Sequence, residues 1–136
     1  MNFVVDASFA LAWVFEDEKS ARTETALDSL GQGAKALVPA LWFWEIGNVL
    51  LSVERQKRAT AAEVSQHLTV FQALPVEMDE AATAEAWRGA RMLARKHSLT
   101  NYDAAYLELS LRRGLPLASL DSRLITAAKA EGVPLV

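Results

Sequence analysis

Four acidic residues occupy positions that could support metal chemistry: Asp6, Glu45, Asp103 and Asp121. If the fold gathers them, their mutual repulsion raises some of their pKa values, and a hard divalent cation with oxygen ligands removes that penalty. Magnesium suits such a site, where it can activate a water for in-line attack on a phosphodiester and stabilise the leaving oxygen. This chemistry needs no cysteine and no histidine base, and the chain has no cysteine and only two histidines.

Three of these acids also have an ordinary structural role available. Asp6 and Asp121 each follow an apolar segment and precede a helical one, so each can act as a helix N-cap. Asp103 stands three residues after Thr100, the reciprocal position of a capping box. Capping does not forbid catalysis, because a side chain at a helix start can point into the same cleft.

Glu45 is harder to assign to a structural role. Between residues 41 and 53 the only polar side chains are Glu45, Asn48 and Ser52, which fall within about 60° of one another on a helical wheel. This narrow stripe predicts a helix buried nearly all round, with one strip facing a polar cavity. An unpaired buried carboxylate is costly, and no Lys or Arg occurs in this helix before Arg55, so a bound cation would neutralise Glu45 well. The alternative is a glutamate exposed at an interface.

The elements that must position these acids alternate between short apolar strands and helices. We expect strands at 3–5, 36–38, 75–78, 115–120 and 133–136. We expect helices at 7–14, 18–30, 41–58, 80–97, 100–113 and 121–131, and the capping box from Thr60 to Glu63 opens one more. This alternation predicts an α/β fold in which a parallel sheet is covered on both faces, within a single domain spanning residues 1–136. Ligands bind at the carboxyl ends of such strands, where Asp6 and Asp121 stand.

Composition narrows the class of protein. Apolar residues make up 51% of the chain, which predicts a real core, and no stretch is long enough to cross a bilayer. The absence of cysteine excludes disulfides and thiolate metal sites, so we expect an intracellular, cytoplasmic protein. The net charge of −3 argues against a general nucleic-acid coat but not against an enzyme that touches a few phosphates.

The residues around the four acids resemble the PIN-domain nucleases, and among them the VapC-type toxins of bacterial toxin–antitoxin pairs. The segments that carry the resemblance span essentially the whole chain: Val4-Val5-Asp6-Ala7-Ser8, Val38-Pro39, Trp44-Glu45, Asn48-Val49-Leu50, Thr100-Asn101-Tyr102-Asp103-Ala104-Ala105-Tyr106-Leu107 and Pro116-Leu117-Ala118-Ser119-Leu120-Asp121.

The resemblance implies a three-layer α/β/α sandwich with a mainly parallel, PIN-like sheet. It also implies a dependence on Mg²⁺, for which Mn²⁺ could substitute. The implied activity is that of an endoribonuclease, whose substrate could be a tRNA-like or other structured RNA. The implied partners are a second copy of the chain, as a homodimer, and a small cognate VapB-like antitoxin that occludes the site.

Carried over by position, the resemblance assigns roles to individual residues. Asp6 and Asp103 would be the principal metal ligands, and Glu45 and Asp121 would complete the acidic pocket directly or through water. The supporting polar residues would be Ser8, Asn48 and Ser119.

Departures from the family pattern leave some points open. Some relatives carry a further acidic residue or asparagine shortly after the last aspartate, where this chain has Ser122 and Arg123. The number of metal ions is therefore open. Ser119 stands where threonine is common.

Other functions fit the same residues less well or stay open. A phosphotransfer domain of the dehalogenase type needs a second aspartate where Ser8 stands, and glycine-rich nucleotide loops are absent. An inactive PIN binding module has no physical need to keep mutually repelling carboxylates. A nuclease that processes RNA without an antitoxin stays open.

Basic and aromatic residues could form contact surfaces. A stripe of Arg88, Arg91 and Arg95 is more simply a solvated face, whereas Arg112, Arg113 and Arg123 lie nearer the acids and are better phosphate candidates. Arg112 can also pair with Glu108. The aromatic residues divide between the core and an exposed patch for a partner: Trp13, Trp42, Phe43 and Trp44.

Overall fold

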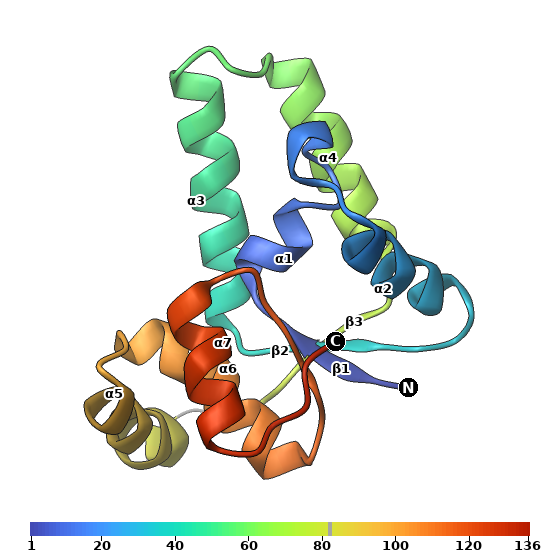
Figure 1. Cartoon of the computed structure of the whole chain (residues 1–136). Coiled ribbons are helices and arrows are strands. Elements are labelled where there is room, and N and C mark those ends of the chain that lie inside the picture. The colour runs from blue at the N-terminus through green and yellow to red at the C-terminus, as the bar shows by residue number, and fades with distance from the viewer. Residues whose placement is uncertain (82) are drawn as a thin grey trace.

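A computed structural model describes residues 1–81 and 83–136 of the chain (Figure 1). Its centre is a sheet of parallel strands in the order β3-β2-β1-β4. The strands are short, and their bounds are β1 Phe3–Val5, β2 Ala36–Val38, β3 Val76–Met78 and β4 Leu117–Ala118. The first and last of these strands along the chain are therefore neighbours in the sheet.

Helices cover both faces of the sheet, which confirms the predicted α/β/α sandwich. The segments α1 (Ala7–Leu11), η1 (Glu16–Glu18) and α2 (Ala21–Gly31) connect β1 to β2, and α3 (Leu41–Arg55) and α4 (Ala61–Ala73) connect β2 to β3. From β3 at one edge of the sheet, the chain crosses in the reverse direction to β4, on the other side of β1. This connection contains η2 (Glu85–Ala90), α5 (Arg91–His97) and α6 (Asn101–Arg113), and α7 (Ser122–Ala130) follows β4. Because parallel crossovers are right-handed, this reversal places η2, α5, α6 and α7 on the face opposite α1 to α4 (Figure 1).

The helix starts follow the predicted capping chemistry. The side chain of Asp6 accepts a hydrogen bond from the Phe9 amide at the start of α1, and that of Asp121 accepts one from the Leu124 amide at the start of α7. The box of Thr60 and Glu63 opens α4 as expected. These caps satisfy backbone donors that a helix leaves unpaired, so they fix where each helix begins.

Several predicted bounds were wrong. The predicted helix 7–14 ends at Leu11, the helix 18–30 is preceded by the separate turn η1, and the helix 41–58 ends at Arg55, shortly before the left-handed Lys57 (φ 59°). The predicted helix 80–97 contains residue 82, which lies outside the described residues; its later part is a π-helical segment, η2, followed by α5.

The last two predicted strands were too long. Within residues 115–120 only Leu117 and Ala118 form β4, although the Pro116 carbonyl also accepts a hydrogen bond from the Val4 amide. Residues 133–136 form no strand; a single parallel bridge joins Leu135 to Leu117. β3 and this bridge therefore mark the two edges of the sheet.

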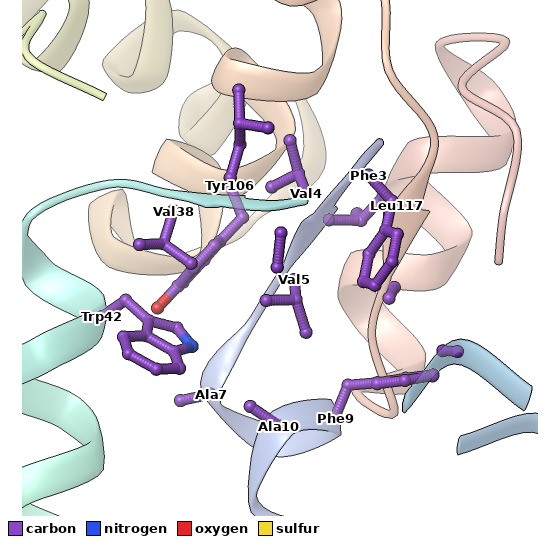
Figure 2. Packing of buried hydrophobic residues seen from close by; sticks show 14 of the residues in the cluster. Phe3, Val4, Val5, Ala7, Phe9, Ala10, Val38, Trp42, Tyr106 and Leu117 are labelled. Atoms are coloured by element: carbon purple, nitrogen blue, oxygen red, sulfur yellow. The ribbon is translucent and has the colours of Figure 1, made fainter. Parts of the chain in front are cut away.

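The core is built on β1, whose residues are all buried (Figure 2). Trp13 and Trp42 join it, and the Trp13 indole donates a hydrogen bond to the Thr23 carbonyl. Phe43 and Trp44 are instead exposed. The prediction that α3 is buried nearly all round is therefore wrong, because only one face of it packs against the core.

None of the helices in the described ranges has both the length and the apolar character that crossing a bilayer requires.

Candidate active site

Asp6 lies at the carboxyl end of the central strand β1 and is the most buried of the four acids, with 5% of its surface exposed. Its Oδ1 accepts hydrogen bonds from the Phe9 amide (2.9 Å) and the Ser8 hydroxyl (2.7 Å), and its Oδ2 accepts one from the Ser119 hydroxyl (2.5 Å). Burial raises the pKa of this carboxyl above its ordinary value, although the hydrogen bonds oppose the shift. Asp6 therefore caps α1, and hydrogen bonds from Ser8 and Ser119 hold its carboxylate in place.

Ser8 and Ser119 connect the ends of β1 and β4. The Ser8 hydroxyl also accepts a hydrogen bond from the Leu120 amide (3.1 Å), and the Ser119 hydroxyl accepts one from the Asp121 amide (3.0 Å). Ser119 is fully buried. Both residues were predicted to support the acids, and the structure places both in contact with Asp6.

Asp103 faces this group from the first turn of α6, where its amide donates to the Thr100 hydroxyl (3.0 Å). Its pKa is raised, first by burial and then by the charge of Asp121. Asp103 in turn contributes to the raised pKa of Asp6. The carboxylates from β1, α6 and the start of α7 are therefore close enough to interact electrostatically.

Glu45 reaches the same group from α3 and is half-buried. Burial raises its pKa, and the charges of Asp103 and Asp6 add to this effect. A hydrogen bond from the Tyr106 hydroxyl to Glu45 Oε1 (2.5 Å) acts in the opposite direction. A protein side chain therefore stabilises the charge of Glu45.

Tyr106 is the site residue that sequence reasoning missed. It lies three residues after Asp103, so the two share one face of α6. Its ring is buried and extends from α6 toward the start of α3, with the phenol oxygen at the α3 end (Figure 2). A tyrosine at this spacing from a candidate acid could have been recognised as a donor to a second carboxylate.

Asn48 was predicted to support the site, but its side chain is exposed and no hydrogen bond ties it to Glu45 in the described structure. Ser52 instead accepts a hydrogen bond from Gln56. The polar stripe on α3 thus contributes one residue, Glu45, to the acidic group.

Arg112 is not available for phosphate. Its guanidinium donates to Asp79 at 2.6 Å and to Glu108 at 2.9 Å, and both partners raise its pKa. The pairing with Glu108 was predicted; the one with Asp79, at the end of β3, was not. Arg113 also approaches Asp79, at 3.5 Å. Arg88, Arg91, Arg95 and Arg123 form no ion pair within the described residues, and all four are exposed.

The arrangement offers only oxygen donors. No three acidic or histidine side chains of the described residues come close enough to enclose an ion by themselves. Magnesium typically takes one or two carboxylates and keeps several waters, so a site of this kind does not need a complete protein cage. The donor chemistry therefore fits a hard divalent cation.

Comparison with known proteins places the chain in a family. The PIN domain family model matches residues 3–130. Ribonuclease VapC3 of Pyrobaculum aerophilum is 34% identical over 128 residues, which cover 91% of this chain and 92% of that protein.

Solved structures share the fold. The protein PAE2754 of Pyrobaculum aerophilum superposes with a TM-score of 0.70 at 24% identity, covering 93% of this chain and 87% of its own. VapBC2 of Rickettsia felis, solved bound to a DNA fragment from its promoter, gives a TM-score of 0.69 at 10% identity over 100% and 98% of the two chains. The match of the family model over nearly the whole chain, together with the identity to VapC3, shows that this chain belongs to the PIN-domain family and resembles its VapC-type members.

Proposed function

We propose that the protein is a metal-dependent endoribonuclease of the VapC type, with Asp6, Glu45, Asp103 and Asp121 as its acidic site. The observation that carries the proposal is that burial and mutual repulsion raise the pKa values of Asp6, Glu45 and Asp103 together, at the carboxyl end of the sheet. A group of like charges is costly unless it serves to bind a cation. The ribonuclease VapC3, a relative of this chain, supports RNA as the substrate.

Asp6 and Asp103 are the residues that would hold the cation, with Glu45 and Asp121 completing the pocket directly or through water. Magnesium is the ion that best suits oxygen donors with retained water, and manganese is a substitute. When bound, the ion supplies Lewis acidity toward a phosphodiester and a more acidic water.

The protein's own part is to hold the carboxylates in place. Hydroxyl and amide donors occupy both oxygens of Asp6, which fixes its orientation. Tyr106 holds Oε1 of Glu45 and leaves Oε2 without that donor. Such preorganisation matters because a displacement of about 1 Å can cost a large share of the rate.

Two kinds of protein partner belong to the proposal. The exposed Phe43 and Trp44 beside Glu45 form part of an apolar surface, which a second copy of the chain or a VapB-like antitoxin would cover. An antitoxin seated there would lie next to the acidic group and could occlude it. The similarity of the fold to the VapBC2 structure supports an antitoxin as the partner.

The proposal is tested by incubating total cellular RNA with purified protein, first shown to be free of antitoxin. We expect fragments with Mg²⁺ or Mn²⁺ and none with excess chelator. Asp103→Asn should abolish cleavage, and Asp28→Asn, at an exposed position on α2, should cleave like the wild type.

Absence of cleavage with both metals, by protein that still binds the RNA, would favour a PIN module that only binds. Cleavage that persists in chelator or in Asp103→Asn would remove the metal or that residue from the mechanism. Light scattering of the same protein tests the homodimer.

A further inference from the structure

A polar hollow opens at the start of α7, the helix that follows Asp121. It has a volume of about 380 Å³ and lies between the end of α5 and α7, lined by His97, Ser98, Ser122, Arg123, Thr126 and Ala127. Ser122 directly follows Asp121, and Ser98 precedes α6, the helix that carries Asp103. The hollow is therefore adjacent in the chain to two of the four acids.

The charge of this hollow differs from that of the site. Arg123 is exposed and pairs with no carboxylate in the described part of the chain. On the opposite wall, His97 Nε2 lies 2.7 Å from Glu131 Oε2, and Lys96 Nζ lies 2.7 Å from the same oxygen. Glu131 is already paired with Lys96 and His97, so this neighbouring carboxylate does not neutralise Arg123.

The other two arginines that sequence analysis placed near the acids behave differently. Arg112 donates to Asp79 and Glu108, and Arg113 approaches Asp79 at 3.5 Å, so both are engaged by carboxylates. Arg123 is thus the arginine next to the site acids that remains available. Its planar fork of donors matches a phosphate, and Ser122 presents a hydroxyl on the same wall.

We propose that this hollow binds a backbone phosphate of the RNA next to the phosphodiester that is cleaved, with Arg123 as the principal contact and Ser122 as a second donor. The inference rests on the proposed function, since it assigns a place to the substrate of that site. An acidic group on a chain of net charge −3 repels an RNA strand unless a local cation holds it. Arg123 supplies that cation and sets the direction in which the strand leaves the site.

A binding measurement tests the hollow independently of cleavage. All variants carry Asp103→Asn so that the RNA stays intact, and fluorescence anisotropy follows labelled total tRNA and a labelled single-stranded RNA of mixed sequence. The variants compared are Arg123→Gln, Arg123→Lys and Arg55→Gln. Arg55 is the matched control, because it is exposed at the far end of α3, away from α7 (Figure 1).

We expect Arg123→Gln to weaken RNA binding about fivefold and to lower the slope of log affinity against log salt by about 0.7, the value for one phosphate contact on a single strand. Arg123→Lys should recover part of the affinity, and Arg55→Gln should change it less than about twofold. Circular dichroism should show each variant folded.

Equal effects of Arg123→Gln and Arg55→Gln would overturn the proposal, and so would no binding of either RNA by the parent at low salt. Binding that depends on Arg123 in a protein that never cleaves RNA would support the hollow and refute the proposed nuclease, so the two failures are distinguishable.

Discussion

The hydroxyl of Ser119 donates a hydrogen bond to Oδ2 of Asp6 at 2.5 Å, although 113 residues separate the two in sequence. The same hydroxyl accepts a hydrogen bond from the Asp121 amide. One buried side chain therefore sets both the orientation of the first acid and the path of the chain that leads to the last one.

Replacing Ser119 by alanine should lower the free energy of unfolding by about 1–3 kcal/mol, because it leaves Asp6 Oδ2 without its donor and the Asp121 amide without its acceptor in a buried place. Urea unfolding measures the loss. Ser119→Thr keeps the hydroxyl and should be much milder, and Ser65→Ala, at an exposed position on α4, should be nearly neutral. A loss no larger than that of Ser65→Ala would show that this hydrogen bond contributes little.

Tyr106→Phe should keep the buried ring and remove the donor to Glu45. We expect a loss of about 1.5–3 kcal/mol of stability, as for a hydrogen bond to a charged group. The pKa of Glu45 should rise further, because the Tyr106 hydrogen bond lowers it. If Glu45 acts as a carboxylate, the acidic limb of the pH–rate profile should then move to higher pH.

Tyr102→Phe provides the matched control for that experiment, since the Tyr102 side chain is exposed and lies one residue before Asp103. An identical pH profile for Tyr106→Phe and the wild type would mean that Glu45 does not titrate in the rate-determining step.

Asp103→Asn should raise the melting temperature of the metal-free protein, because it removes a charge that interacts with Asp6, Glu45 and Asp121. Thermal unfolding in chelator measures the effect, and Mg²⁺ should stabilise the wild type more than this variant. A clearly lower melting temperature without metal would instead assign Asp103 a structural role at the start of α6.

The metal-free protein should become more stable as the pH is lowered through the raised pKa values of Asp6, Glu45 and Asp103. Folding raises the pKa values of Asp6, Glu45 and Asp103, so between their ordinary and raised pKa values the folded state binds more protons than the unfolded state. Stability is therefore lost as pH rises through the raised pKa values.

Glu131 has the opposite effect, because its pKa is lowered by Lys96 and His97, and its contribution is lost only as the pH falls through that lowered pKa. Melting curves against pH in chelator should show the rise, and Asp6→Asn should flatten it. A melting temperature that increases steadily as the pH rises above the ordinary pKa values of these carboxyls would contradict the raised pKa values.

The sequence predicted the elements that carry the site because their signals are local. Apolar triplets mark β1 and β2, and the caps at Asp6 and Asp121 mark the helices that follow β1 and β4. A parallel sheet then brings the ends of its strands to one edge. The residues that hold Asp6, namely Ser8 and Ser119, were found through the family resemblance.

Longer-range pairing was not predictable in the same way. Arg112 was expected to pair within its helix, but its additional contact with Asp79 depends on how α6 lies across the end of β3. Glu45 has no basic residue near it in its own helix, and a tyrosine hydroxyl on another helix supplies the contact that the sequence did not predict. The burial of α3 was overestimated since an apolar helix face can be left for a partner as well as for the core.

The neighbouring positions of β1 and β4 in the sheet also bear on when the protein can become active. During synthesis on the ribosome, Asp6 emerges early, but the serine that orients it and the aspartate beyond β4 follow more than a hundred residues later. A nascent or prematurely terminated chain that stops before β4 lacks one wall of the acidic group. If the proposed function holds, partial products should therefore be inactive, and only a nearly finished chain should cleave RNA.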